Sequence, residues 1–423
     1  MNNEIICDVN SADEITLAAT ELRGTLAAKE ITPGKVLDGF EAWAAALGAA
    51  ATAEIPGVQF LRIWLRRGTL APILARELGR NAHCGEWIEE GRARIRACPL
   101  GIVGHWPAAN IEIQPVLSMT CGLLGGNASL VRVSPELSEP TKLILERLEE
   151  SDREGVLRER IRMFVFDHSR RDLHEAMARS VDGAMIWGGE EAVLKVRSLP
   201  FPHWAKLAVF GPRISVAVMD ADSWFNGDTR ETWCRRIARD VWQFDQQACS
   251  SPQVLFLEKK VGHSPREFVP WLTRAFEQEN LAHPRRSIHA ALTSAICQAR
   301  ASWLLDDVAH SAFFSKGPDW TILLGCGTEI PKPTQGKTLT VLEVDDLADP
   351  VMRLDGNVQA LGLAMADPVR ESTIASIAAR RGVDRIVKLG RMHVFAPPWD
   401  GVDLIRPMMR LVRHVPSVEA ESR

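Results

Sequence analysis

The chain has 423 residues, of which 46% are hydrophobic and 25% are charged, and its formal net charge is −4. This length favours two domains of ordinary size, and the composition is typical of a globular protein rather than a disordered or membrane-inserted one. The small negative charge gives no electrostatic footprint for nucleic acid or for an anionic membrane surface, so we expect neither as a partner.

The first hundred residues are predicted to be mostly helical. The opening stretch, MNNEIICDVNSADEI, carries acids where a signal peptide needs cations, which predicts a cytoplasmic protein. Ala, Leu and Glu then dominate, and Pro33 and Pro56 divide the stretch into several helices, one of them over residues 58–78. From Arg92 the pattern of ARIRACPLGIVGHW becomes that of strands.

Apolar runs then alternate with helical segments. Ala128 to Val133 is predicted as a buried strand, followed by a helix with Ser134 as N-cap and Pro135 at its first position. The strands MFVF and GAMIWGG follow, and the second runs into the helix EEAVLKVRSL. This order of strands and helices predicts a parallel sheet with both faces covered.

A second α/β pattern begins near residue 213. The strand ISVAVMD precedes the helix TRETWCRRIARDVWQF and a strand at Val254–Leu257. Helices are expected near 265–280 and 286–304. The strands TILLG, LTVLEV and VQALGLAMAD follow, and ESTIASIAARRGVDRIVKLG supplies one more helix and strand. The fold class is therefore α/β.

The cysteine and histidine spacing indicates no metal site. The eight cysteines are Cys7, Cys84, Cys98, Cys121, Cys234, Cys249, Cys297 and Cys326. They form no CxxC pair and no Cys/His cluster of the kind that zinc requires, so we expect free thiols. His168 and His174 are six residues apart, as are His283 and His289, and neither pair shares a helix face.

One thiol has an unusual setting. In FDQQACSSPQVLFLE, residues 244–258, Cys249 has small and polar neighbours and lies between a long helix and a strand. Such a junction can face a cleft and leaves backbone N–H groups unpaired, which favours a nucleophile; inert packing is the ordinary alternative for a cytosolic cysteine. Cys234, by contrast, lies inside a predicted helix.

The stretch QQACSSPQ resembles the nucleophile motif of the acyl-CoA reductase branch of the aldehyde dehydrogenase superfamily. This branch includes the fatty-acyl reductase component of bacterial bioluminescence. Five other segments agree in order and spacing, over roughly residues 95–401. They are PAANIEIQP, GLLGGNASLVRVSPE, MIWGGEEAV, MDADSW and RIVKLGRMHVFAPPWDG.

The resemblance implies an aldehyde dehydrogenase-like fold of two α/β domains with parallel, Rossmann-like sheets. A cofactor-binding domain over 1–212 and a catalytic domain over 213–395 are expected, with a segment 396–423 that returns to the first domain. A small β extension for oligomerisation is also implied. Its expected strand is RARIRACPLG, near 92–101, with an edge that needs a partner, so a homo-oligomer is expected.

Two catalytic residues follow from the resemblance. Cys249 is the nucleophile, and Asn110 donates its side-chain amide to the oxyanion together with a backbone N–H. Such a donor lowers the barrier by about 3 to 4 kcal/mol. An Asx-turn between Pro107 and Pro115 is the structural alternative for Asn110.

The resemblance also implies a cofactor site. Arg132 falls where relatives place a lysine for the adenosine ribose, and Pro135 falls where NAD-preferring enzymes usually carry a glutamate. Arg132 and Ser134 without a nearby carboxylate can accept a 2′-phosphate, which favours NADPH. Gly188 and Gly189 offer N–H groups to a pyrophosphate. A surface ion pair for Arg132 and an ordinary βα turn for the glycines are the alternatives.

The sequence departs from relatives at two places. Ala208, in KLAVFGP, takes the position of the glutamate with which aldehyde-oxidising relatives activate water, so an acyl-enzyme can wait for hydride. IPKPTQGK occupies the place of the glutamate that holds the nicotinamide ribose. His393 and Trp399, near PPWDG, either line the cleft or are structural.

Together these features predict an NADPH-dependent reductase that converts an acyl-CoA or related acyl thioester to the aldehyde through a thioester on Cys249. A partner acyl ligase or synthetase is a possible source of the acyl group. One alternative is an acyl-transfer or scaffold protein that works with such a ligase without redox chemistry. A reductase of acyl phosphates is the other.

Overall fold

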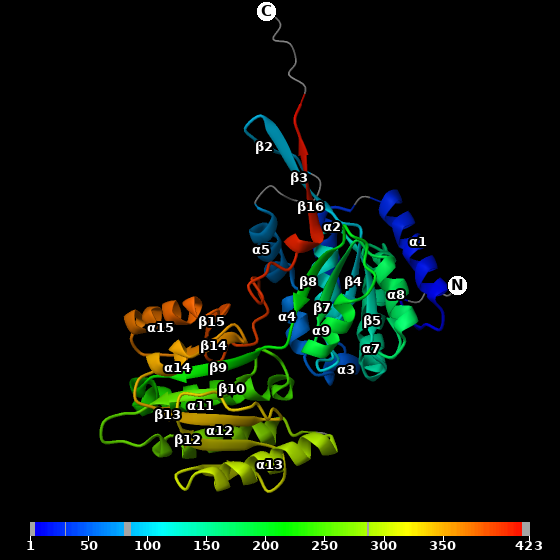
Figure 1. Cartoon of the computed structure of the whole chain (residues 1–423). Coiled ribbons are helices and arrows are strands. Elements are labelled where there is room, and N and C mark those ends of the chain that lie inside the picture. The colour runs from blue at the N-terminus through cyan, green and yellow to red at the C-terminus, as the bar shows by residue number, and fades with distance from the viewer. Residues whose placement is uncertain (1–4, 30, 80–85, 286, 417–423) are drawn as a thin grey trace, which may run out of the picture. The chain divides into compact units, whose positions relative to one another are not determined.

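The computed structural model describes residues 5–29, 31–79, 86–285 and 287–416. The chain divides into two compact units. Unit 1 comprises Met1–Gly211 and Ala396–Arg423, and unit 2 comprises Pro212–Phe395 (Figure 1). Within the described ranges, no helix is both long and apolar enough to cross a membrane.

Unit 1 is built on a six-stranded sheet in the order β1-β6-β5-β4-β7-β8, and every neighbouring pair is parallel. The strands are β1 Ile6–Asp8, β4 Ile102–Trp106, β5 Ala128–Val133, β6 Ile161–Val165, β7 Gly183–Trp187 and β8 Lys206–Phe210. The predicted parallel sheet is confirmed. The short edge strands β1 and β8 were not predicted, because they lack the continuous apolar run of a doubly covered strand.

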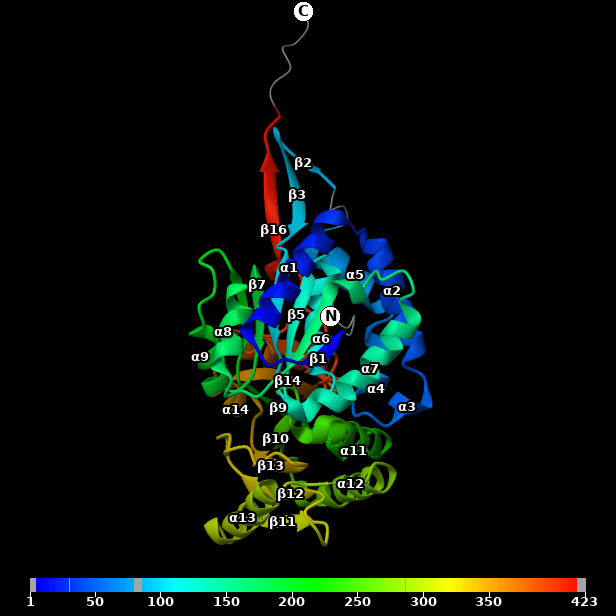
Figure 2. The ribbon, with the colours of Figure 1, turned by 90° about the vertical axis from the view of Figure 1, so that its right-hand side faces the viewer.

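Helices cover both faces of this sheet (Figures 1 and 2). They are α1 Ala12–Ala28, α2 Pro33–Ala46, α3 Ala50–Ala53, α4 Val58–Trp64, α5 Arg67–Leu78, α6 Gln114–Leu124, α7 Ser138–Ser151, α8 Arg171–Arg179 and α9 Glu190–Arg197. The one-turn 3-10 helices of this unit are η1 Pro135–Leu137, η2 Arg158–Arg160 and η5 Arg406–Met408. The first helix starts at a capping box, in which Ser11 and Glu14 satisfy each other's backbone N–H groups.

The helix predicted over 58–78 is two helices. Arg66 has extended backbone (φ −62°, ψ 141°) and separates α4 from α5. A residue of another helix determines this break. The Glu41 carboxylate on α2 accepts the first N–H of α5, that of Arg67, at 2.8 Å. A carboxylate at that point favours a new helix start.

The expected role of Ser134 as the N-cap of an α-helix is wrong. Ser134 instead precedes η1, and its side chain makes no capping hydrogen bond. The N–H of Leu137 donates to the Ser134 carbonyl at 2.9 Å and closes a 3-10 turn, so that α7 begins only at Ser138.

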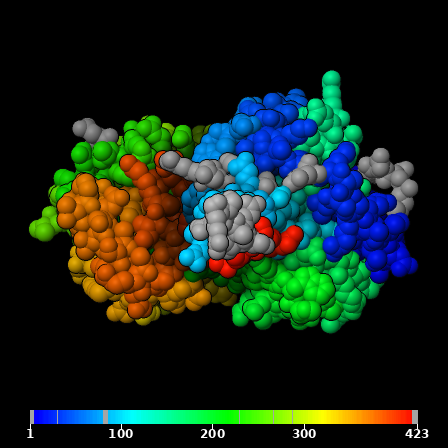
Figure 3. All heavy atoms as spheres, turned by 90° about the horizontal axis from the view of Figure 1, so that it is seen from above, coloured from blue at the N-terminus to red at the C-terminus, as the bar shows by residue number. Residues whose placement is uncertain are grey.

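A three-stranded antiparallel sheet completes unit 1, in the order β16-β3-β2. Its strands are β2 Ile88–Glu90, β3 Ala93–Pro99 and β16 Met409–His414. In the space-filling view of Figure 3, the red atoms of β16 lie beside the cyan atoms of β2 and β3. The predicted strand near 92–101 is therefore present as β3, and it is the central strand of this sheet. The C-terminal β16, more than 300 residues away in sequence, pairs with residues 94–99 of β3. On the other side β2 pairs only with residues 93–95, so among the described residues the expected open edge is limited to 96–99.

A buried glutamate attaches the returning C-terminal segment. The carboxylate of Glu77 accepts the backbone N–H groups of Leu404, Ile405 and Arg406 at 2.9, 2.6 and 3.0 Å. Burial raises the pKa of Glu77 although these bonds favour the charged form. The hydrogen bonds hold the chain where it leads into β16.

Unit 2 has a seven-stranded sheet in the order β11-β12-β13-β10-β9-β14-β15, parallel except for the edge strand β11. Its strands are β9 Ile214–Met219, β10 Pro252–Glu258, β11 Ser311–Phe314, β12 Thr321–Cys326, β13 Thr338–Val344, β14 Val358–Ala364 and β15 Arg385–Lys388. Its helices are α10 Ala221–Phe225, α11 Gly227–Trp242, η3 Gln243–Gln246, η4 Pro265–Glu267, α12 Val269–Ala282, α13 Ala290–Asp306, α14 Ala348–Met352 and α15 Pro368–Arg380. The two helices expected near 265–280 and 286–304 are α12 and α13.

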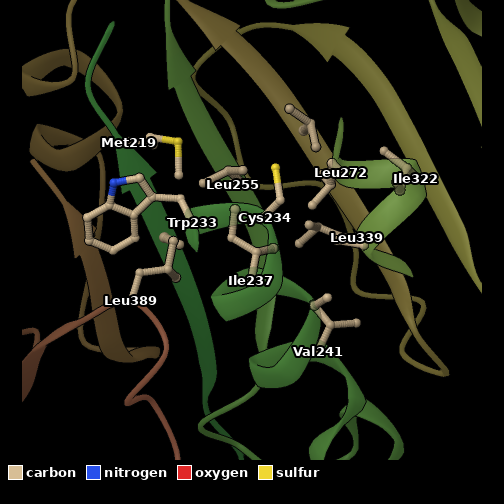
Figure 4. Close-up of a cluster of buried hydrophobic side chains, with 14 of the residues drawn as sticks. Met219, Trp233, Cys234, Ile237, Val241, Leu255, Leu272, Ile322, Leu339 and Leu389 are labelled. Carbon is tan, nitrogen blue, oxygen red and sulfur yellow. The ribbon is translucent and has the colours of Figure 1, made fainter. Parts of the chain in front are cut away.

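One face of this sheet packs against α11 and α12 around a dense apolar cluster (Figure 4). Cys234 and Ile237 project from α11 toward Leu255 of the strand that follows Cys249, and Trp233 belongs to the same cluster. Cys234 is fully buried, and burial raises the pKa of its thiol to about 12, so it is a packing residue, as its helical setting predicts.

Candidate functional site

The residues that are predicted to stabilise the oxyanion and to bind the cofactor lie at the carboxyl edge of the unit 1 sheet. In the strand order the chain turns one way from β4 through β5 to β6, and the other way through β7 to β8. The crevice between the carboxyl ends of β4 and β7 is thus a topological switch point, where α/β sheets bind ligands. Asn110 follows β4, and Gly188 and Gly189 follow β7. Arg132 lies near the end of β5, and Ser134 directly follows that strand.

Asn110 lies exposed in the turn between β4 and α6. The neighbouring side chain of Trp106 is buried at the end of β4, where its Nε1 donates to His174 Nδ1 at 2.9 Å. The turn therefore rises from a fixed strand end, with the amide of Asn110 accessible at the carboxyl edge.

Arg132 has donors to spare. Its Nη2 donates to the Phe166 carbonyl at 3.2 Å, and its Nε is buried without a hydrogen-bond partner. Burial lowers the pKa of Arg132, which remains a cation at neutral pH because an arginine starts above 12. Ser134, two residues on, is also buried. Arg132 itself is half-buried, and a partly exposed cation at this edge fits an anionic cofactor group.

The expectation that no carboxylate lies near this strand end is wrong. Glu136, in η1, and Asp167, after β6, are close enough for their charges to raise the pKa of Arg132 against the effect of burial. Position 135 is a proline as the sequence shows, but the 3-10 turn brings the next residue, Glu136, toward the cation. This field opposes a second negative charge on the ligand, and so weakens the sequence argument for a 2′-phosphate.

Gly188 and Gly189 form the turn that leads into α9. Gly188 has φ 154°, a conformation that favours glycine. Its N–H donates to the Phe210 carbonyl of the neighbouring strand, so the expectation that this N–H is offered to a pyrophosphate is wrong. A Cβ built on Gly189, the N-cap of α9, would meet nothing within 4 Å. This open space at a helix start fits a pyrophosphate, although Glu190 and Glu191 already occupy the first turn.

A buried relay of hydrogen bonds, which the sequence analysis did not predict, fixes β7, the strand that ends at this turn. Trp187 Nε1 donates to Ser118 Oγ at 2.9 Å, and that oxygen is 2.8 Å from His105 Nδ1. His105 Nε2 lies 3.2 Å from Ser129 Oγ. Burial lowers the pKa of His105 to about 3, so the ring is neutral, with one nitrogen donating and the other accepting. The relay joins β7, α6, β4 and β5 beneath the turn at Gly188.

Cys249 lies in unit 2, in the turn between η3 and β10, and is half-buried. The setting that the sequence predicts, a turn between a helix and a strand, is present. The carbonyl of Cys249 accepts a hydrogen bond from Ser215 Oγ at 2.7 Å, while the following Ser250 and Ser251 are buried. The backbone of the cysteine is therefore held against the start of β9.

The approach to Cys249 is a left-handed turn of three non-glycine residues. Phe244, Asp245 and Gln246 have φ of 54°, 52° and 61°. Each such residue costs about 1 to 2 kcal/mol, so tertiary contacts must hold the turn. Arg285 supplies one contact, because its Nε and Nη2 donate to Asp245 Oδ1 at 3.0 and 2.8 Å.

A second left-handed turn, at Gln335, Gly336 and Lys337, packs against the first. The amide of buried Gln246 donates to the carbonyl of Thr338 at 2.9 Å and accepts from its N–H at 2.7 Å. Lys337 Nζ lies 3.6 Å from Asp245 Oδ1. The segment IPKPTQGK, which lacks the expected glutamate, thus helps to position the turn that carries Cys249.

His393 supports the residue after the cysteine. Its Nε2 is 2.7 Å from the Asp240 carbonyl and must donate to it, which leaves Nδ1 to accept from Ser250 Oγ at 2.9 Å. Burial lowers the pKa of His393 to about 4, so the ring is neutral at pH 7. Both nitrogens are engaged, which indicates the structural role rather than the cleft wall.

Asp240 on α11 holds the segment that contains His393. Its carboxylate accepts the N–H groups of Gly390 at 2.5 Å and Met392 at 3.4 Å. Burial raises the pKa of Asp240 to about 7, against the effect of these bonds. Asp240 and Gln246 were missed from the sequence; their position in the helix and turn that precede the QQACSSPQ motif was the available signal.

The remaining expectations from the sequence concern the replaced glutamate at position 208, metal ligands and disulfide bonds. Ala208 is buried in the middle of β8, opposite Met185. Within the described ranges, no group of three or more His, Cys, Asp or Glu side chains is placed to hold a metal ion. The described cysteines are free thiols, and Cys84 lies outside the described residues.

Comparisons with known proteins agree on family and fold. A family model described as acyl-CoA reductase (LuxC) matches residues 42–414. The long-chain acyl-protein thioester reductase of Vibrio harveyi is 25% identical over 358 residues, which span 82% of this chain and 71% of that protein. The long-chain acyl-protein thioester reductase 2 of Photobacterium leiognathi is 21% identical over 350 residues, which span 82% of this chain and 70% of that protein.

Solved structures of aldehyde dehydrogenases share the fold. Betaine aldehyde dehydrogenase from Staphylococcus aureus, solved in complex with NAD⁺, superposes with a TM-score of 0.71 at 13% identity over 96% of this chain and 87% of that one. A lactaldehyde dehydrogenase gives a TM-score of 0.70 at 15% identity over 96% and 91%. The chain therefore has the aldehyde dehydrogenase-like fold that the sequence predicts.

Proposed function

The chain belongs to the acyl-CoA reductase (LuxC) family, and on that premise we propose that it reduces an acyl thioester to an aldehyde with NADPH, through a covalent thioester on Cys249. The observation that carries the proposal is the cysteine itself. Cys249 is half-buried, and it follows a strained turn at residues 244–246 that two distant segments hold in place. Strain maintained in this way is typical of functional positions.

The proposed reaction has two stages. The Cys249 thiolate attacks the acyl carbonyl, and the carbon–sulfur bond to the donor thiol breaks, so that the thiol leaves. NADPH, when bound, supplies a hydride to the acyl carbon. The bond from that carbon to Cys249 then breaks, releasing aldehyde and thiolate. One acyl thioester, one NADPH and one proton become one aldehyde, one thiol and one NADP⁺. Asn110 is proposed as the oxyanion donor, a role that rests on the resemblance of its segment.

Arg132, Ser134 and the turn at Gly188 and Gly189 are proposed to hold the cofactor. The preference for NADPH over NADH rests on Arg132 and is opposed by the charges of Glu136 and Asp167. A ratio of kcat/KM for the two cofactors decides it, and Arg132→Met is expected to lower the value for NADPH more than that for NADH.

The substrate is proposed to be an acyl-CoA or an acyl group on a protein thiol. Relatives named long-chain acyl-protein thioester reductases support a long-chain acyl group on a protein thiol. A partner acyl ligase is proposed as the source of that group. A homo-oligomer with β16 or β2 at its contact is proposed as well, because both are edge strands.

Intact-mass spectrometry tests the central step. Purified protein is incubated with a long-chain acyl-CoA, without and with NADPH, beside the variants Cys249→Ala and Cys297→Ala; Cys297 is an exposed thiol on α13. We expect an acyl adduct in the wild type and in Cys297→Ala but not in Cys249→Ala, and aldehyde once NADPH is added.

Other outcomes favour the alternatives. An adduct on Cys249 that NADPH never turns over, while a partner ligase or carrier removes it, indicates acyl transfer or scaffolding. An adduct that forms with an acyl phosphate but not with acyl-CoA indicates an acyl-phosphate reductase. An adduct that survives in Cys249→Ala would overturn the proposal.

A further inference from the structure

A second ligand site is indicated at the opposite edge of the unit 1 sheet from the proposed cofactor site. A hollow of about 400 Å³ is lined by Gly101, Gly126 and Arg160, which lie just before β4, β5 and β6, and by residues of α1, β3 and β16. Because these three strands are parallel, the hollow lies at their amino ends. The cofactor residues occupy the carboxyl ends.

The described lining of the hollow is basic. Four of its lining residues are cations, and no described residue that lines it is an acid. The four are Lys29, Arg96, Arg160 and Arg410. They come from the end of α1, from β3, from the turn before β6 and from β16, so that the fold, rather than one stretch of sequence, gathers the charge.

The central cation is buried, and its hydrogen bonds to described residues go to carbonyl groups rather than to a carboxylate. Arg160 is only 4% exposed, and its guanidinium donates to the carbonyl of Gly126 at 3.3 Å and to the carbonyl of Lys29. Both acceptors are neutral. The adjacent Glu159 has its carboxylate 2.7 Å from Lys29 Nζ. Arg410 likewise donates to a carbonyl, that of Pro99, at 3.4 Å.

Buried cations are normally matched by anions, because an uncompensated buried charge is costly. A guanidinium presents paired N–H donors that match phosphate oxygens, and several arginines together favour an ion with more than one negative charge. The hollow falls within the size range of small-molecule sites, roughly 300 to 1,000 Å³, and is larger than one free ion needs.

We propose that this hollow, with Arg160 at its base and Arg96 and Arg410 at its sides, binds the phosphate or diphosphate group of a small molecule. The bound anion would link β3 and β16 to the amino ends of the parallel strands. Binding should therefore stabilise the attachment of the three-stranded sheet to unit 1, because a ligand that binds only the folded state raises its stability.

Isothermal titration calorimetry and thermal melts of the full chain test the proposal, with inorganic pyrophosphate as the probe. Pyrophosphate also resembles the cofactor, so the titrations are done in the Arg132→Met background as well. Arg410→Met removes a cation from the hollow, and Arg413→Met, an exposed position of the same strand outside the hollow, is its control. Arg160→Met is a second variant, read only if its melting profile matches the wild type.

We expect saturable binding and a raised melting temperature that survive Arg132→Met and Arg413→Met, with affinity at least about tenfold weaker in Arg410→Met, or about 1.4 kcal/mol. Citrate, a carboxylate anion of similar charge, should bind more weakly. No saturable binding overturns the proposal, and so does binding that Arg132→Met abolishes or that Arg410→Met and Arg413→Met weaken equally.

Discussion

Replacing Asp240 with asparagine should make unit 2 less sensitive to pH. Burial raises the pKa of Asp240 from 3.8 to about 7 in the folded protein. Between these values the unfolded chain has lost the proton and the folded chain keeps it. The folded state then binds more protons, so its stability falls as the pH rises from about 4 to about 7 and is flat above.

The magnitude follows from the shift. A difference of roughly three pKa units corresponds to about 4 kcal/mol over this range. In Asp240→Asn the side chain is neutral at every pH, and its amide oxygen can still accept the N–H of Gly390. The variant should match the wild type near pH 4.5 and exceed it by a few kcal/mol at pH 8, a difference of roughly 10 °C in the melting temperature of a unit of this size.

The assay is a series of thermal melts from pH 4.5 to 8, with Glu231→Gln, an exposed acid on the same helix, as the control. His393 contributes with the opposite sign, because its pKa is lowered to about 4 and its stabilising effect is lost as the pH falls from 6.5 toward 4. That contribution is common to both proteins and cancels in their difference. Parallel pH profiles for Asp240→Asn and the wild type would refute the reasoning.

Three further variants test the proposed functional residues of unit 1 and of unit 2, each by itself. Asn110→Ala should lower kcat by about a hundredfold or more with little change in KM, as expected for a lost oxyanion donor, in a steady-state aldehyde assay. Gln246→Leu leaves the N–H and carbonyl of Thr338 unpaired, and should lower the free energy of unfolding by about 3 kcal/mol in urea titrations. His105→Phe cuts the relay beneath the turn at Gly188, and should raise the KM for NADPH about tenfold without slowing acylation of Cys249. Equal effects on acylation and on KM would argue for a general packing defect instead.

The parallel sheets were predictable because strands buried on both faces have continuous apolar sequences. The helices between them are distinguished by the helical periodicity of their apolar residues. β10, Pro252–Glu258, is buried along its whole length and is evident from VLFL alone. The break at Arg66 was not predictable, since it depends on Glu41 in another helix. The central position of β3 was hidden for the same reason, because its partner β16 lies at the other end of the chain.

In the candidate site, too, features with a local sequence pattern were predictable and features that depend on tertiary contacts were not. The type and position of Cys249 could be read from its neighbours, because a thiol among small polar residues between a helix and a strand is itself a local pattern. The three left-handed residues before it could not, since none is a glycine and nothing local favours φ near 55°. Contacts from distant parts of the chain, among them Arg285 and Thr338, make that conformation stable.

This division bears on how a thioester on Cys249 would survive. Of the titratable groups that hold its turn and the segment beside it, His393 has both nitrogens bonded and is neutral, and the Asp240 carboxylate accepts backbone N–H groups. Asp245 is bound to Arg285. Each is committed to fixing the backbone, so none of the three is free to activate water. Within unit 2, the groups that make the turn rigid are thus not available as bases. None of the three can activate water against an acyl group on Cys249, as a reductase requires.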